Sequence, residues 1–451
     1  MNTRIKDMTE GSPLKLIVTF AIPLMIGNAF QQFYSMVDTI VVGQGVGVEA
    51  LAALGAADWI NWMILGVVLG FTQGFSILIS QVFGENNQQK LKKVIAMCFV
   101  VGILMAILLT IGSILLIKPL LILLNTPENI LQQSISYLTI IFSGILVITI
   151  YNTFSAILRA LGDSKTPLYA MMFAALINIG LDLLFVIGFK KGVVGAAIAT
   201  VIAQFSSSLF CLKALSRIEI IQVTKKDFKL DGAIISRLCE LGIVTAFQNI
   251  IISVGGMVVQ SVVNGFGFIF VAGFTATNKL YGLLELAAIS LGYSMATYSG
   301  QNLGAKKYQR IKKGMRTCAI LSVLTSFILS GVLIPFGKVI LHLFVSGDQM
   351  ITSQVLDVAY HYLFIMLLFL WILYLLHVFR SCLQGMGNTI VPMISGIAEL
   401  TMRVGIALIL PRFIGQEGIF YAEIFAWLGA VIILIPAYFI FMNKLTKPSY
   451  D

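Results

Sequence analysis

Three polar stripes stand out in an otherwise apolar chain. The members of the first are three, four and three residues apart, so their side chains share one face of a helix. They are Asn28, Gln31, Ser35 and Asp38. An acid near the centre of a lipid bilayer costs roughly 2.5 to 3.5 kcal/mol on insertion scales, so such acids are usually functional. Pro23 precedes the stripe and makes a bend easier there, because it lacks a backbone donor.

The other two stripes extend the set of oxygen ligands. Asn178 and Asp182 are four residues apart, and the third stripe repeats the same spacing with Thr200, Gln204 and Ser208. Two carboxylates with amide and hydroxyl oxygens nearby suit Na⁺, whereas a desolvated carboxylate pair can carry H⁺ near neutral pH. A single hydroxyl residue inside a membrane helix is explained by an interhelical hydrogen bond, which contributes about 0.6 kcal/mol to the stability of the bundle. Such bonds do not explain two acids and an asparagine, for which we favour a cation site.

The elements that position these residues are membrane helices. Of the 451 residues, 58% are hydrophobic and 11% are charged, against roughly 25% charged in a soluble domain. The sequence lacks the ten-residue segments of alternating hydrophobicity that are typical of a membrane β-barrel. We therefore predict an all-α polytopic membrane protein. Twelve apolar segments are long enough to span: 14–42, 51–82, 94–117, 131–158, 167–189, 192–214, 238–263, 268–300, 317–341, 352–384, 391–411 and 417–442.

The basic residues predict the orientation in the membrane. Most of the 30 lysines and arginines fall at the N-terminus or in the even-numbered loops, Arg380 among them. The odd-numbered loops hold Lys118, Lys190, Lys191, Lys338 and Arg412. We expect a multi-pass protein of the cell (plasma) membrane. The positive-inside rule places both of its termini in the cytoplasm. The net charge of +10 reflects this topology and not a nucleic-acid partner.

The chain also repeats itself. Gln81-Val-Phe-Gly84 recurs as Gln301-Asn-Leu-Gly304, and a Pro recurs at 167 and 392. Six spans per repeat is an even number, so the repeats are parallel and related by a pseudo-twofold axis along the membrane normal. We predict an N-lobe over 1–214, a cytoplasmic linker over 215–232 and a C-lobe over 233–451, with a central cavity between the lobes.

No constellation for enzyme chemistry appears. The five cysteines are scattered without a C-x-x-C, and the three histidines form no ligand motif. We therefore expect no enzyme, no metal centre beyond a possible Na⁺, and no cofactor other than the coupling ion.

Several motifs together resemble the multidrug and toxic compound extrusion (MATE) family over nearly the whole length. They are Val37-Asp38-Thr39 with Gly43, the two Gln-x-x-Gly loops, Arg159-Ala-Leu-Gly162-Asp163 with Pro167, and Asn178-x-x-x-Asp182. The N-lobe is most similar to the DNA-damage-inducible and archaeal branch of that family.

The resemblance implies an H⁺- or Na⁺-coupled antiporter that exports amphipathic, often cationic drugs or toxic metabolites as a monomer. It implies a cation site at Asp38, Asn178, Asp182 and Thr200, and it assigns Gln31 and Asn152, which we group with Gln204, to the substrate cavity. A flippase for a lipid-linked saccharide is the alternative. It would be expected to carry cationic residues in the cavity, and the two acids speak against it.

The C-lobe lacks the same acids. Under the repeat, Asp38 corresponds to Gly255, Asn178 to Arg403 and Asp182 to Ala407. We therefore expect coupling in the N-lobe alone. Glu399 and Arg403 are four residues apart, which predicts a structural ion pair. The candidates left to line the cavity are Lys279, Glu285 and Glu423.

Overall fold

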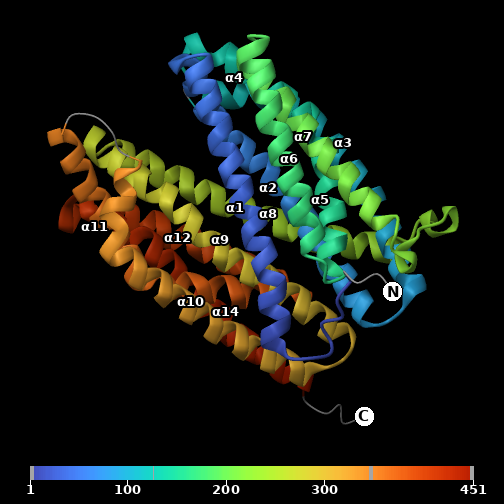
Figure 1. Ribbon diagram of the computed structural model, residues 1–451. Helices are drawn as coiled ribbons and strands as arrows, with labels where there is room; N and C mark the ends of the chain where they lie inside the picture. Colours follow the sequence, from blue (N-terminus) through green and yellow to red (C-terminus); the bar gives the residue numbers. More distant parts are fainter. Residues whose placement is uncertain (1–4, 125, 345–348, 447–451) are drawn as a thin grey trace. The chain divides into compact units, whose positions relative to one another are not determined.

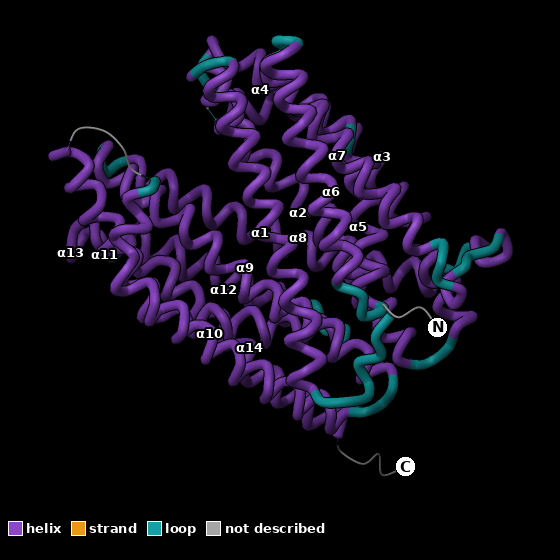
Figure 2. Tube along the Cα trace, in the orientation of Figure 1, coloured by secondary structure: helices purple, strands orange, loops and turns teal. Residues whose placement is uncertain are grey.

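The computed structural model describes residues 5–124, 126–344 and 349–446. Within these ranges all regular elements are helices joined by short turns, and no strand occurs (Figure 2). The contacts divide the chain into two compact units: unit 1 comprises Met1–Met8 and Ile22–Asn249, and unit 2 comprises Thr9–Ala21 and Ile250–Asp451. The boundary falls inside α1 (Pro13–Gly45) and α8 (Gly232–Asn264).

Unit 1 contains most of α1, the first part of α8 and the helices between them (Figure 1). These are α2 (Val48–Gly84), α3 (Gln88–Leu123), α4 (Glu128–Ser143), α5 (Ile145–Ala160), α6 (Lys165–Asp182), the π-helix η1 (Leu183–Gly188) and α7 (Gly192–Leu215).

Unit 2 contains the start of α1, the rest of α8 and the helices that follow. These are α9 (Phe268–Gly304), α10 (Tyr308–His342), α11 (Gln349–Gly385), α12 (Ile390–Ile409), α13 (Pro411–Ile414), the 3₁₀ helix η4 (Gly415–Phe420) and α14 (Tyr421–Thr446).

The helices account for the predicted membrane architecture. Within the described residues, ten helical segments are long and apolar enough to cross a bilayer, and the bent pair α4 and α5 adds another. The last of the ten runs over Ile390–Thr446, but α12 and α14 pack against each other within it and so form a hairpin of two crossings. The multi-pass, all-α fold is therefore confirmed.

One predicted span is broken. The segment 131–158 was predicted as a single helix, yet α4 and α5 meet at Gly144 with a bend of 47°. A Cβ at Gly144 would lie 2.7 Å from Cγ2 of Val201 on α7. The close approach of α7 requires glycine at the bend.

The N-terminal segment divides its contacts between the units. The Lys6 backbone N–H donates to the carbonyl of Leu161 in unit 1, at 3.1 Å. Within unit 2, Lys307 Nζ lies 3.1 Å from the Thr9 carbonyl, and Arg310 Nη2 lies 3.0 Å from the Gly11 carbonyl. The packing of α1 changes from one unit to the other next to Pro23.

The segment between α7 and α8 packs on unit 1. It contains two 3₁₀ helices, η2 (Glu219–Ile221) and η3 (Lys225–Phe228), and Ile218 and Ile221 are buried in the core of unit 1. Lys93 Nζ donates to Asp231 Oδ2 at 2.6 Å. This hydrogen bond, with one from the backbone of Ile234, lowers the pKa of Asp231.

The two units repeat one arrangement. In unit 1, Ser134 Oγ on α4 donates to the carbonyl of Ala53 on α2, a separation of 81 residues. In unit 2, Thr277 Oγ1 on α9 donates to the carbonyl of Ala359 on α11, a separation of 82 residues. Corresponding helix pairs are thus linked in both units, although the donor lies on the later helix in unit 1 and on the earlier helix in unit 2.

Within unit 1, α2 crosses α8 along a row of glycines. A Cβ at Gly70 would lie 2.4 Å from the backbone N and Cα of Ala246, and one at Gly74 would lie 2.8 Å from the backbone N of Gly242. The Asn249 amide donates to the Gly66 carbonyl at 2.9 Å. Small residues let the two backbones meet, as is common between membrane helices.

We predict that Gly70→Ala lowers the melting temperature of the purified protein markedly, because the methyl group would overlap the α8 backbone. Overpacking of this kind costs about 1 to 3 kcal/mol. Gly55→Ala on the same helix is the matched control, since a Cβ there meets nothing within 4 Å. Equal melting temperatures for the two variants would contradict the close crossing.

The topology predicts which turns face the outside. In a background with Cys239→Ser, which removes the one native thiol that is not buried, a cysteine at exposed Gln44 or Asn264 should react with an impermeant reagent in intact cells. A cysteine at exposed Gln88 should react only after lysis. The reverse labelling pattern would invert the positive-inside assignment.

Candidate functional site

Two glycine contacts fix the register of α1 against α6. A Cβ at Gly27 would lie 3.6 Å from Cα of Leu168, and one at Gly45 would lie 3.4 Å from Cγ1 of Val186. Both helices advance by 18 residues between these contacts, so they run parallel and side by side. Asp38 therefore lies level with the turn of α6 that carries Asn178 and Asp182.

The helix α7 returns antiparallel to α6 and brings Thr200 to the same level. A Cβ at Gly195 would lie 3.0 Å from the carbonyl carbon of Phe185, and Ser207 Oγ donates to the Ala170 carbonyl at 3.3 Å. Interpolation between these contacts sets the half-buried Thr200 opposite Asn178. The four residues predicted to bind a cation thus share one layer of unit 1.

This layer is deeply buried and poorly hydrogen-bonded. Asn178 and Asp182 have no exposed surface, and Asp38 is 9% exposed. Both carboxylate oxygens of Asp182, both polar atoms of the Asn178 amide and Oδ1 of Asp38 have no hydrogen-bond partner in the described chain. Asp38 and Asp182 are also within electrostatic reach of each other. An unsatisfied buried polar group costs about 1 to 3 kcal/mol and a charged one more, so a positive ion would relieve a large penalty.

A π-helical turn follows Asp182 directly. In η1 the Phe189 N–H donates to the Leu184 carbonyl, five residues earlier, at 2.8 Å. Single π-turns in membrane and soluble helices frequently mark functional sites. Val186 in this turn is buried and meets Gly45 at the end of α1, so the turn anchors the helix that carries Asp38.

The residues predicted to line a substrate cavity fall into two groups. Gln31 is exposed on α1 and Gln204 is half-buried on α7, and the Tyr34 hydroxyl lies within hydrogen-bonding reach of both side chains. Asn152 on α5 instead donates its amide to the Ile148 carbonyl of its own helix, at 2.9 Å. The structure thus brings Gln31 and Gln204 together at Tyr34, whereas the Asn152 amide is bonded within its own helix.

Three further residues interact with the acids of this layer and were not predicted. Asp58 on α2 is within electrostatic reach of Asp38, and the buried Tyr137 on α4 is within reach of Asp38, Asp58 and Asp182. Tyr34 continues the spacing of the first stripe, and Asp58 is an acid inside an apolar segment, so both had a signal in the sequence. Tyr137 had none, because only the fold brings α4 to this layer.

The equivalent place in unit 2 holds an arginine. Nη1 of Arg403 lies 3.1 Å from the position that a Cβ on Gly255 would take. These are the counterparts of Asn178 and Asp38 under the repeat, and their contact supports that correspondence. The position of the acid Asp38 in unit 1 is thus occupied by a glycine in unit 2. The position of the amide Asn178 is occupied by a cationic arginine.

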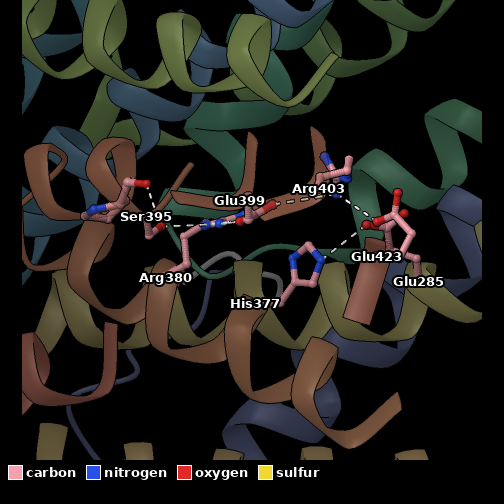
Figure 3. A network of polar contacts seen from close by, with 8 residues as sticks. Glu285, His377, Arg380, Ser395, Glu399, Arg403 and Glu423 are labelled. Carbon is pink, nitrogen blue, oxygen red and sulfur yellow. Dashed lines mark hydrogen bonds and ion pairs between the residues drawn. The ribbon is translucent and has the colours of Figure 1, made fainter. Parts of the chain in front are cut away.

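Arg403 belongs to a buried ionic network in unit 2 (Figure 3). Its Nη2 lies 2.8 Å from Glu423 Oε2 and 4.0 Å from Glu399 Oε2. Glu399 pairs with Arg380, which lies inside α11. The predicted ion pair between Glu399 and Arg403 is present, but each of the two residues has a shorter contact with another partner. The prediction that Arg380 lies in a cytoplasmic loop was wrong. Glu399 on α12 compensates the buried charge of Arg380 on α11. The spacing of residues in the sequence does not reveal this pair, because it joins two different helices.

The other ionisable residues of unit 2 are placed as follows. Glu285 on α9 lies 3.3 Å from Nε2 of His377 on α11, and Lys279 is exposed on α9. Among the described residues, no three His, Cys, Asp or Glu side chains are arranged to hold a metal ion together. The oxygen-rich layer of unit 1 suits a monovalent cation better than a transition metal.

A multi-pass helical bundle made of two repeats, with a buried polar layer in one of them, has the architecture of a secondary transporter. The MatE family model matches residues 23–184 and 245–410, and the chain belongs to this family, the MATE transporters. Members of the family are transporters and not enzymes, and they need no cofactor. The family resemblance found in the motifs is confirmed.

Curated relatives and solved structures agree with this assignment. The chain is 31% identical over 364 residues to the probable multidrug resistance protein YpnP of Bacillus subtilis, covering 80% of this chain and 81% of the relative. It is 24% identical to the probable multidrug resistance protein NorM of Thermotoga maritima, covering 93% and 89%. A MOP superfamily transporter from Pyrococcus furiosus has the same fold, with a TM-score of 0.93 at 22% identity over 99% of both chains.

We predict that Asp38 and Asp182 bind cations as one coupled unit. The melting temperature of the wild-type protein should change with pH or Na⁺, since a ligand that binds only the native state stabilises it. Asp38→Asn and Asp182→Asn should each abolish this change, and the double variant should lose no more than either single one. The control is Asp357→Asn, because Asp357 forms an exposed pair with Lys338. Additive losses would contradict a shared site.

Proposed function

We propose that this MATE transporter is a cation-coupled antiporter that exports small amphipathic, often cationic organic compounds by alternating access. It acts as a monomer in the cell membrane with both termini in the cytoplasm. Its lobes are residues 1–214 and 233–451, joined by the linker 215–232. The coupling ion is H⁺ or Na⁺.

One observation carries the proposal: the buried oxygens of Asp38, Asn178 and Asp182 have no hydrogen-bond partner in the described chain. Two buried carboxylates within electrostatic reach of each other and without donors are stable only when a proton or a metal cation neutralises them. Together with the hydroxyl of Thr200 they form the cation site. Both ions use the same oxygens, so the geometry supports either.

The substrate class follows from the relatives. YpnP, NorM and the Staphylococcus aureus multidrug export protein MepA are all described as multidrug proteins. Gln31, Asn152 and Gln204 contact the exported compound from the substrate cavity. The multidrug relatives and the acidic layer do not favour a flippase for a lipid-linked saccharide.

Coupling acts through the shape of α1. Pro23 is buried at the point where α1 changes its packing, between Ala21 and Ile22. MATE structures of the same fold have been solved in a bent and in a straight conformation, with TM-scores of 0.91 and 0.90. We propose that a cation at Asp38 changes the shape of α1 and lowers the affinity for the exported compound. Linkage then requires that the compound lowers the affinity for the cation equally.

The energy available is sufficient for export. Each elementary charge that enters down the membrane potential supplies about 2.3 kcal/mol per 100 mV, before any concentration term. About 1.4 kcal/mol corresponds to a tenfold gradient, so one charge entering at about 100 mV sustains more than tenfold accumulation outside of a compound without net charge. Export of a monovalent cation against the same potential needs a second entering charge or an ion concentration gradient.

Transport into proteoliposomes under an imposed pH gradient or an imposed Na⁺ gradient tests the proposal, with a fluorescent cationic dye as substrate. Wild type should move dye against its gradient with one of the two ions, and Asp38→Asn and Asp182→Asn should each reduce this at least tenfold. Asp357→Asn should transport normally, because its exposed ion pair contributes little.

Two results would refute the proposal. If both N-lobe variants still concentrate dye, the cation site lies elsewhere. If neither gradient drives wild-type transport although dye equilibrates across the vesicles, the protein is not an antiporter for these ions.

A further inference from the structure

The ionic network of unit 2 contains one more acid than it has arginines (Figure 3). Arg380 and Arg403 supply two fixed positive charges. The carboxylates are those of Glu285, Glu399 and Glu423. With a neutral His377 imidazole the six side chains carry a net charge of −1, and one added proton balances them. Inside a membrane protein such an imbalance is costly, so intramembrane charges tend to be paired.

The unbalanced acid can be identified from its contacts. Glu399 pairs with Arg380, and Arg403 donates to Glu423 at 2.8 Å. Glu285 is left with Nε2 of His377, at 3.3 Å. Both arginines are within electrostatic reach of Glu285, so the pair belongs to the same cluster.

Of the three imidazoles in the chain, His377 is the one that contacts this ionic network, whereas His342 and His361 take no part in its ion pairs. Imidazole is the side chain that changes charge between about pH 5 and pH 8. The remaining ionisable groups on α11 and its neighbours are either in the network or elsewhere along the helices. The charged residues and histidines among them are Lys279 on α9, Arg310, Lys312, Lys313, Arg316, Lys338 and His342 on α10, Asp357 and His361 on α11, Glu417 on η4 and Lys444 on α14. Asp357 pairs with Lys338, and His361 lies 3.5 Å from Glu417.

We propose that Glu285 and His377 form a proton-binding site in unit 2, distinct from the acidic layer of unit 1. The proton binds to the imidazole and is held between Nε2 and the Glu285 carboxylate. This pair is the most accessible part of the network, because the side chains of Glu285 and His377 are 30% and 16% exposed, whereas those of the two arginines are below 10%. Protonation completes the charge balance of the network without breaking either arginine pair.

A native fluorophore reports on this site. Trp427 stacks on Tyr281 with ring centroids 6.0 Å apart, and Tyr281 is within electrostatic reach of Glu285 and Glu423. Replacing the other three tryptophans by phenylalanine leaves Trp427 alone. They are Trp59, Trp62 and Trp371.

The experiment is a pH titration of Trp427 fluorescence in purified, detergent-solubilised protein. A single step between pH 5 and pH 8 is expected, and His377→Gln and Glu285→Gln should each remove it. His361→Gln is the matched control, since it removes an exposed His–Glu contact on the same helix and should leave the step intact. Asp38→Asn should also keep the step, which separates this site from the one proposed in unit 1.

The proposal is overturned if the single-tryptophan protein shows no step, or if the step survives in His377→Gln. Nuclear magnetic resonance covers the case in which the network variants misfold. With His342→Gln and His361→Gln, a ¹³C-labelled histidine reports His377 alone in an otherwise intact network. A resonance that moves between two protonation states over this range, and no longer does so in Glu285→Gln, supports the pair. A resonance that stays in one state refutes it.

Discussion

The cost of an uncompensated charge inside the helix bundle is the constraint on which the rest of this structure depends. A carboxylate in such a place needs a partner, and the chain provides two kinds. In unit 2 the partners are guanidinium groups of the chain itself, at Arg380 and Arg403. In unit 1 the carboxylates of Asp38 and Asp182 meet no cationic side chain in the described network of ion pairs, and their buried oxygens lack donors. For Asp38 and Asp182, unlike Glu399 and Glu423, the compensating charge must come from solution.

This difference arose on a duplicated scaffold. Both units join corresponding helix pairs by a hydroxyl-to-carbonyl bond at nearly the same sequence separation, and both place the first helix of the repeat against the fifth. The contact between Gly255 and Arg403 therefore shows where the Asp38 and Asn178 layer would be in unit 2. Glycine there leaves room for the long arginine side chain, which an aspartate would obstruct. The absence of an acid at Gly255 and the presence of arginine at 403 are thus sterically and electrostatically linked.

The sequence was sufficient for whatever depends on local spacing. Hydropathy predicted the membrane helices, helical periodicity placed Asn178 and Asp182 on one face, and fixed offsets revealed the repeat. It was insufficient where contacts come from distant helices. The bend at Gly144 depends on Val201, the pairing of Arg380 depends on Glu399, and Tyr137 joins the acidic layer from another helix. The π-turn after Asp182 also gave no signal, because its sequence is a uniform apolar run.

The asymmetry of the units has a consequence for how such a protein can be driven. A guanidinium that is covalently part of the chain neutralises Glu399 and Glu423 in every conformation that keeps the network together, so those acids cannot exchange ions with the solvent. In the proposed cation site, a proton or Na⁺ between Asp38 and Asp182 can leave, and its departure restores the full cost of the uncompensated buried charges. Free energy from an ion gradient can therefore enter only where the compensating charge is removable. The arginine pairs of Glu399 and Glu423 are thus a fixed part of unit 2, whereas the proposed cation site at Asp38 and Asp182 gives unit 1 a charge state that can vary.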